Sequence, residues 1–228
     1  MLKQLIELER RLSEVFGPEQ AARLDELLAE PLGDELTRAQ ALRFGALLHD
    51  IGKPATRDVL ASGRVTFMGH DRLGEQMVAE LSRRLRTSER FARFVGGLTR
   101  HHLVLGFLVH ERPLDAVKAY RYLRRTAPVE VEVTVLSCAD RLATRGRRAD
   151  EATKAHLELA REVMSAALDW REQGPPRVPV RGDELARELG IEPGPELGRL
   201  LAELEEAAYA GEASTREQAI ALARRLTA

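Results

Sequence analysis

The feature that most constrains the fold is a helical stripe of apolar residues. The stripe consists of Phe44, Leu47, Leu48 and Ile51. This spacing predicts an amphipathic helix that is largely buried. Gly52 and Pro54 follow the stripe and are expected to end the helix. The sequence therefore predicts a buried helix that stops close to residue 52.

His49 and Asp50 lie side by side at the expected end of this helix. Burying an unpaired carboxylate is costly, so Asp50 needs a partner. A divalent metal ion bound by the imidazole and the carboxylate together would be such a partner. The alternative is a His-Asp pair that is satisfied by hydrogen bonds alone.

Further candidate ligands follow His49 and Asp50 along the chain. The chain has six histidines, and His70, His101 and His102 also fall at expected ends of elements in its first half. Asp140 lies in another mainly apolar helical stretch, residues 137–144. This order resembles the HD superfamily of metal-dependent phosphohydrolases, in which a His-Asp pair is followed by one or two histidines and then by a late aspartate.

The resemblance implies two groups of ligands. The first group binds one divalent metal ion and consists of His49, Asp50 and Asp140. The second group binds another ion or the substrate phosphate and consists of His70 with His101 or His102, of which the family register favours His102. Carboxylate and imidazole ligands suit Mn, Fe, Co, Ni or Mg, and the sequence does not select among these metals.

One ligand position of the HD enzymes has no histidine in this sequence. These enzymes usually carry a metal-binding His on a helix before the His-Asp pair, whereas no His precedes His49 here. The resemblance implies that a residue of segment 4–9, a water molecule or nothing takes that place.

A closer resemblance extends from about Leu36 to the C-terminus. Three segments, 42–54, 69–74 and 139–146, are similar to the HD domain of bacterial CCA-adding enzymes, which are tRNA nucleotidyltransferases. Three later segments, 181–185, 189–198 and 211–217, are similar to the RNA-binding C-terminal region of that family. The resemblance therefore makes tRNA an expected partner.

Those enzymes add nucleotides with an N-terminal head that carries a Gly-Gly or Gly-Ser turn and an Asp-x-Asp pair. Nothing before Leu36 resembles this head, so the chain alone is not expected to add nucleotides. One alternative function is a non-catalytic tRNA-binding module, or the body and tail of a split nucleotidyltransferase that works with a separate head. Another is an iron oxygenase, which the HD superfamily also includes but which would need the full set of histidines.

The activity that the resemblance implies is metal-assisted hydrolysis of a phosphoester. The ion would activate water and neutralise phosphoryl oxygens, with Asp50 and Lys53 as the catalytic residues. The residues expected to bind phosphate are Lys53, Arg72, Arg141 and Arg145. The implied substrates are nucleotides, 2′,3′-cyclic phosphates or RNA ends. An alternative role for Lys53 is to complement the dipole of the preceding helix.

Arginine supplies nearly all of the positive charge, because lysine occurs only at positions 3, 53, 118 and 154. One arginine cluster follows Asp140 and consists of Arg141, Arg145, Arg147 and Arg148. A second lies on an expected helix and consists of Arg121, Arg124 and Arg125. Arginine binds phosphate in a bidentate fashion, although solvated surface positions explain such a bias equally well. The cluster after Asp140 is the exception, because its helix leads to the expected metal site. Because the net charge is −1, any RNA contact must be local.

The remaining composition indicates a globular protein of a reducing compartment. The single cysteine, Cys138, excludes an internal disulfide, and its apolar neighbours favour a packed thiol over a nucleophile. No apolar run approaches the ~20 residues of a membrane span, and the N-terminus lacks the apolar core of a signal peptide. We therefore expect a cytoplasmic protein with no membrane contact. Trp170 and Tyr209 could stack on RNA bases, but packing is the favoured role for both.

The fold expected from these patterns is mainly α: an all-helical HD bundle with one short β-hairpin and a small helical tail. The expected domains are an N-terminal helical segment (1–35), an HD domain (36–173), a linker (174–180) and a helical tail (181–228). The hairpin is expected over 59–67, and helices over 73–85 and 88–102. Residues 129–135 alternate as a strand would, but they run into the helical Asp140 segment and are assigned to a helix. Ser214 and Glu217 are expected to form a capping box at the last helix.

Overall fold

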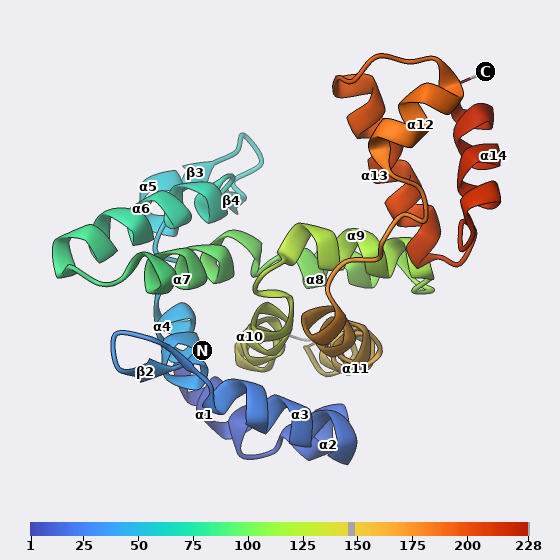
Figure 1. Ribbon diagram of the computed structural model, residues 1–228. Helices are drawn as coiled ribbons and strands as arrows, with labels where there is room; N and C mark the ends of the chain where they lie inside the picture. Colours follow the sequence, from blue (N-terminus) through green and yellow to red (C-terminus); the bar gives the residue numbers. More distant parts are fainter. Residues whose placement is uncertain (146–148, 228) are drawn as a thin grey trace. The chain divides into compact units, whose positions relative to one another are not determined.

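A computed structural model describes residues 1–145 and 149–227, which are mainly α-helical (Figure 1). The chain divides into two compact units, one made of Met1–Arg112 with Thr126–Arg171, and the other of Pro113–Arg125 with the chain from Glu172 onward. Helix α9 (Ala116–Thr126) thus belongs mostly to the second unit, although its residues lie inside the expected 36–173 domain. Within the described residues, no helix is both long enough and apolar enough to span a membrane.

The first unit starts with three helices, α1 (Leu2–Glu9), α2 (Leu12–Phe16) and α3 (Pro18–Ala29). The break between α2 and α3 is set by Gly17, which adopts φ +88°, and by Pro18 at the first position of α3. Strands β1 (Pro31–Gly33) and β2 (Leu36–Thr37) then form a short antiparallel pair. The side chain of Thr37 caps α4 (Arg38–Leu48) by accepting a hydrogen bond from the backbone N–H of Gln40.

The next elements are α5 (Lys53–Thr56), β3 (Asp58–Val59), β4 (Val65–Thr66), α6 (His70–Leu85), α7 (Glu89–His101), α8 (Val104–Leu108) and the 3₁₀ turn η1 (Val109–Glu111). Strands β3 and β4 are antiparallel, which confirms the expected hairpin. Helix α6 starts three residues earlier than expected, and the side chain of Ser88 caps α7. Helix α7 packs against both α6 and α4.

Helix α10 (Glu130–Ala143) is the most deeply buried element of the first unit. All ten residues from Glu130 to Ala139 are buried. The alternating pattern of residues 129–135 therefore does not mark a strand, and the assignment of this segment to a helix is confirmed. The helix packs against α1, α4, α7 and α8. Cys138 is fully buried there, and this burial raises the pKa of its thiol, as expected for a packed cysteine.

Three helices of the tail have their own apolar core. The helices α12 (Gly182–Leu189), α13 (Pro195–Tyr209) and α14 (Arg216–Thr227) follow α11 (Ala149–Gln173) and the irregular segment around residues 174–181. Buried leucines at 185, 197, 200 and 204 pack together with Ile220. The expected capping box is shifted by one residue, because Thr215 and Gln218 form the reciprocal hydrogen bonds.

The prediction of which face of α4 is buried was wrong. Phe44 is 41% exposed and Leu47 is 64% exposed, whereas Leu42, Gly45 and Ala46 are buried. Small residues are needed there because a Cβ on Gly45 would lie 2.5 Å from the Leu98 side chain on α7. The helix also ends earlier than expected, at Leu48, and Pro54 lies in the first turn of α5 instead of ending α4.

Candidate metal centre

Three histidines of the first unit have the same backbone contact. In each, Nδ1 faces the carbonyl oxygen of the residue three positions earlier. The contacts are His49 to Ala46 at 3.0 Å, His70 to Phe67 at 2.7 Å and His102 to Thr99 at 2.7 Å. A carbonyl oxygen can only accept a hydrogen bond, so Nδ1 is the protonated nitrogen. Nε2 of each ring is therefore available as a metal ligand whenever that ring carries no second proton.

These histidines come from element ends that meet in one place. His49 directly follows α4, His70 is the first residue of α6, and His102 directly follows α7. The turn after Asp50 approaches α6 through Gly52, where an added Cβ would lie 2.3 Å from the carbonyl oxygen of His70. A glycine at position 52 therefore brings the His-Asp pair beside His70.

Oδ1 of Asp50 lies near two of the Nε2 atoms. It is 3.5 Å from Nε2 of His70 and 3.7 Å from Nε2 of His102, and these two nitrogens are 3.3 Å apart. Ligand atoms of these three residues all lie within 4.8 Å of one another, and both histidines are buried. Oδ1 is buried too, and no described residue donates a hydrogen bond to it.

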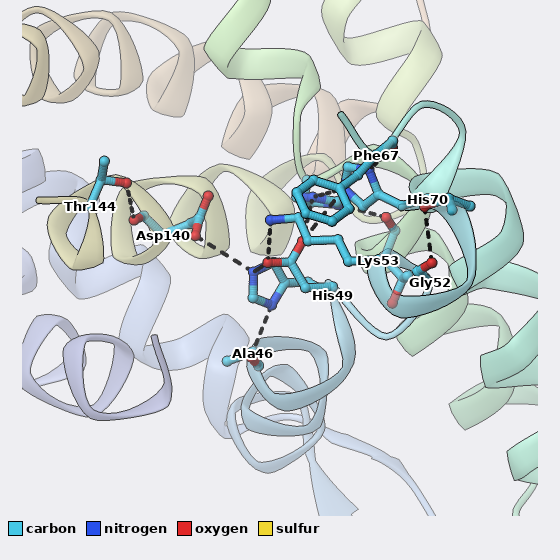
Figure 2. Close-up of polar contacts among 12 residues, drawn as sticks. Ala46, His49, Gly52, Lys53, Phe67, His70, Asp140 and Thr144 are labelled. Atoms are coloured by element: carbon cyan, nitrogen blue, oxygen red, sulfur yellow. Dashed lines mark hydrogen bonds and ion pairs between the residues drawn. The ribbon is translucent and has the colours of Figure 1, made fainter. Parts of the chain in front are cut away.

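Oδ2 of Asp50 faces a second set of groups, His49 and Lys53, which Figure 2 labels together with Asp140. It lies 3.2 Å from Nε2 of His49 and accepts a hydrogen bond from Nζ of Lys53 at 2.7 Å. The same Nε2 of His49 is 3.5 Å from Oδ1 of Asp140 on α10. Asp50 thus stands between a His70–His102 group and a His49–Asp140 group.

The electrostatics of the two groups differ. Burial disfavours a charge on His49, but the hydrogen bonds to Asp140 and Asp50 more than offset it and raise the pKa of His49 from 6.5 to about 9. The carboxyls of Asp50 and Asp140 are half-buried, which disfavours their charged form, yet His49 holds the pKa of each below its ordinary value. Burial lowers the pKa of His102 from 6.5 to about 4, so this ring is neutral at pH 7.

The donor set fits a divalent cation. With Nδ1 protonated, the Nε2 lone pairs of His70 and His102 face each other across 3.3 Å and face the unsatisfied Oδ1 of Asp50. Such an arrangement of lone pairs is repulsive unless a cation is bound between them. Imidazole and carboxylate ligands suit Mn, Fe, Co, Ni or Mg. His70, His102 and Asp50 would hold one ion. His49 and Asp140 would bind an ion beside Oδ2 of Asp50.

The expected cationic residues lie at different distances from this centre. Lys53 touches it through Asp50, and its Nζ also lies 5.7 Å from the centre of the Phe67 ring. Arg141 follows Asp140 and is half-buried, and its Nε has no hydrogen-bond partner among the described residues. Arg72 in α6 and Arg145 after α10 are exposed. Arg147 and Arg148 lie outside the described residues.

The structure also distinguishes His102 from His101 and shows the contacts of the N-terminal segment. Among the described residues, His102 and not His101 belongs to the group around Asp50. In segment 4–9, Glu9 pairs with Arg43 at 2.7 Å, and Leu5 and Leu8 are buried in the core. Glu9 is therefore engaged away from the candidate ligands.

Other expected and unexpected residues lie outside the centre. Trp170 is buried, and the ring of Tyr209 packs at a tilt against that of Tyr120 with ring centres 5.6 Å apart, so both take part in packing. His156, which had no evident partner in the sequence, is buried and lies 3.1 Å from Oγ of Ser137 on α10. Burial and the charge of Arg141 lower its pKa from 6.5 to about 4. The sequence could not predict this contact, because Ser137 and His156 are 19 positions apart and no local pattern relates them.

The basic cluster on α9 is engaged within the second unit. Arg121 pairs with Glu206 at 2.8 Å, and Arg124 pairs with Glu205 at 2.9 Å, both on α13. These carboxylates neutralise two of the three arginines that the sequence suggested for RNA contact. The cluster thus ties α9 to α13.

Comparisons with known proteins agree with this geometry. The model of the HD domain family matches residues 20–145. The chain is 34% identical over 186 residues to the A-adding tRNA nucleotidyltransferase of Deinococcus radiodurans, covering 81% of this chain and 41% of that protein. It is 32% identical over 180 residues to the CC-adding tRNA nucleotidyltransferase of Thermus thermophilus, covering 78% and 38%.

A third relative is matched over a shorter segment. The bifunctional uridylyltransferase/uridylyl-removing enzyme of Mycobacterium tuberculosis is 38% identical over 90 residues, which cover 40% of this chain and 10% of that protein. The chain spans about two fifths of the length of the two tRNA nucleotidyltransferases.

Proposed function

The chain belongs to the HD domain family, and we propose that it is a metal-dependent phosphohydrolase whose centre is formed by His49, Asp50, His70, His102 and Asp140. The observation that carries the proposal is the convergence of imidazole Nε2 atoms on a buried carboxylate oxygen that accepts no hydrogen bond from the described residues. A site with this surplus of lone pairs is suited to a divalent cation.

Each residue has a distinct part in the proposed reaction. Asp50 contributes one oxygen to each ligand group, and the backbone carbonyls fix the orientation of the imidazoles. The bound ion supplies an activated water and neutralises phosphoryl oxygens. Lys53 is 38% exposed and uses one of its three N–H groups on Asp50, so it can donate another to a phosphoryl oxygen. Arg141 can donate from its half-buried guanidinium, while Arg72 and Arg145 would contact more distant phosphates.

The proposed substrates are nucleotides, 2′,3′-cyclic phosphates or RNA ends. Two relatives act on tRNA, as their names state, and the third is a uridylyl-removing enzyme. Removal of a uridylyl group breaks a bond to a nucleotide phosphate, which is the type of bond proposed here. In this proposal the domains are those expected from the sequence, with the segment from 181 onward as the RNA-contacting tail, in a cytoplasmic protein.

The proposal is tested by hydrolysis assays on metal-stripped protein supplied with Mn, Ni, Co or Mg. The panel contains p-nitrophenyl phosphate, its bis ester, 2′,3′-cyclic AMP and 2′-AMP. We expect metal-dependent turnover that falls at least about a hundredfold in Asp50→Ala, because a ligand to both groups is lost. Lys53→Met is expected to keep its bound metal and lose turnover.

The control is Glu80→Gln, which removes one carboxylate charge from the exposed surface of α6. It is expected to hydrolyse the panel at the wild-type rate. Folding of each variant is checked by circular dichroism. Absence of hydrolysis by folded, metal-loaded wild-type protein across the panel would contradict the proposal.

A second candidate function is tRNA binding without hydrolysis, either alone or as part of a split nucleotidyltransferase. The similarity to two tRNA nucleotidyltransferases over about four fifths of the chain favours it, together with the lack of a His before His49. The measurement is tRNA binding over a range of salt concentrations. Salt-dependent binding with no turnover in the metal assays would support this second function.

A further inference from the structure

The two helices that carry His70 and His102 meet at their ends. His70 starts α6, and His102 directly follows α7. The helices approach closely at Gly74, where an added Cβ would lie 2.8 Å from Cγ2 of Thr99. Thr99 is also the residue whose carbonyl oxygen accepts the Nδ1 proton of His102. The separation of the two helix ends therefore sets the separation of the two imidazoles.

An ion pair crosses this junction. Nη1 of Arg100, in the last turn of α7, is hydrogen-bonded to Oδ2 of Asp71, in the first turn of α6. Both side chains are only 21% exposed, and Nε of Arg100 also lies 3.6 Å from Oε2 of Glu75. An acid at a helix start and a base at a helix end each complement the local helix dipole.

Each residue of the ion pair lies close in sequence to one of the two histidines. Asp71 follows His70 directly, and Arg100 precedes His102 by two residues. Arg100 thus joins α7 to α6 through Asp71 and, at a longer distance, through Glu75. The pairs Arg83 with Glu80 and Arg93 with Glu89 each lie within one helix. The pair is thus placed to fix the distance between the Nε2 atoms.

We propose that Asp71 and Arg100 are positioning residues that hold His70 and His102 at the separation a single metal ion requires. The inference rests on the proposed function, because it assigns the His70–His102–Asp50 group to a metal. Neither residue is placed among the candidate ligands. Loss of the pair removes neither imidazole but lets the helix ends move. It therefore weakens metal binding without removing a ligand.

The test is the Mn²⁺ dissociation constant of the metal-stripped full chain, measured by competition with a fluorescent chelator. We expect Arg100→Gln and Asp71→Asn each to raise Kd about tenfold, the lower end of the range for residues that orient metal ligands. The double variant is expected to bind Mn²⁺ no more weakly than Arg100→Gln, since Arg100→Gln already removes the contact that Asp71→Asn removes. Arg100→Lys keeps a cation at this place and should recover part of the affinity.

Glu80→Gln is the matched control for Asp71→Asn, because it removes one negative charge from the exposed face of α6, the helix that carries Asp71. His70→Ala gives the Kd expected when a ligand itself is lost, and each positioning variant should lie between it and the wild type. A wild-type Kd in Arg100→Gln and Asp71→Asn, with or without a lower unfolding temperature, would overturn the inference and leave the proposed function standing. Effects of the two substitutions that add in the double variant would overturn it as well.

Failure of the proposed function has a different signature. Wild-type protein that binds no Mn²⁺ in this titration would remove both the metal site and the inference. Binding that is lost in His70→Ala and unchanged in Arg100→Gln would remove the inference alone.

Discussion

The two ends of α10 are both rich in buried charge, but they are neutralised in different ways. At the N-terminal end, Glu132 is hydrogen-bonded to Arg38 at 2.7 Å and to Arg171 at 2.8 Å, and Arg171 also bonds Glu130 at 2.7 Å. At the C-terminal end, Asp140 is paired with an imidazole, that of His49.

The difference lies in whether the neutralising cation can leave. Although burial opposes it, Glu132 and Glu130 raise the pKa of Arg171 above its ordinary value, so its charge is permanent. His49 is cationic only below its pKa of about 9, and a metal ion can replace its proton. One end of the helix is therefore a structural ion network, and the other has an exchangeable cation, which is what a metal centre needs.

The middle of α10 gives a third case, in which a buried titratable group stays neutral. His156 lies against Ser137, and its pKa of about 4 reflects burial and the nearby charge of Arg141. The side chains that contact α10 thus carry a permanent positive charge at one end, no charge in the middle and an exchangeable positive charge at the other end.

The largest effect is expected from breaking the permanent network. Arg171→Met leaves Glu130 and Glu132 buried without their main partner, so we expect the free energy of unfolding to fall by about 3–5 kcal/mol. The measurement is urea unfolding. Arg83→Met, which removes an exposed pair on α6, is expected to change it by less than about 1 kcal/mol. Equal losses in the two variants would erase the contrast between the ends of α10.

A slightly smaller effect is expected from acid at the neutral middle. The pKa of His156 is about 4 in the folded protein, below the ordinary 6.5, so the unfolded chain binds its proton first. The stabilisation is complete above pH 6.5 and is lost as pH falls from 6.5 to 4, by up to about 3 kcal/mol. His156→Gln can keep a bond to Ser137 and should remove this share of the acid sensitivity. Identical pH profiles of unfolding would count against a neutral buried His156.

The exchangeable end should respond to metal. Mn²⁺ at a hundred times its Kd is expected to raise the free energy of unfolding by about 2.7 kcal/mol, if it binds only the folded protein. Asp50→Asn should lose this gain, whereas Arg83→Met should keep it. The measurement is thermal unfolding with and without Mn²⁺. A full gain in Asp50→Asn would place the ion elsewhere.

Local patterns predicted much of this arrangement. The helical register of the segment before Asp140 placed α10, and the His-Asp pair at a helix end placed the centre. The partners of Glu132 could not be predicted, because Arg38 and Arg171 lie 94 and 39 residues away in sequence. The buried face of α4 was wrong because it depends on how closely Leu98 approaches Gly45. His101 and His102 remained alternatives because only the geometry of the α7 end shows which ring faces Asp50.

The most direct test of the central claim is calorimetric titration of Mn²⁺ into metal-stripped protein at pH 7.5, in two buffers with different ionisation enthalpies. The pKa of His49 is about 9 and that of His102 is about 4, so an ion that binds His49 beside Oδ2 of Asp50 should release about one proton from His49 and none from His102. This predicts an apparent affinity that falls about tenfold per pH unit below pH 9. Binding with no proton release would contradict the claim that a metal replaces the proton of His49 at the exchangeable end of α10.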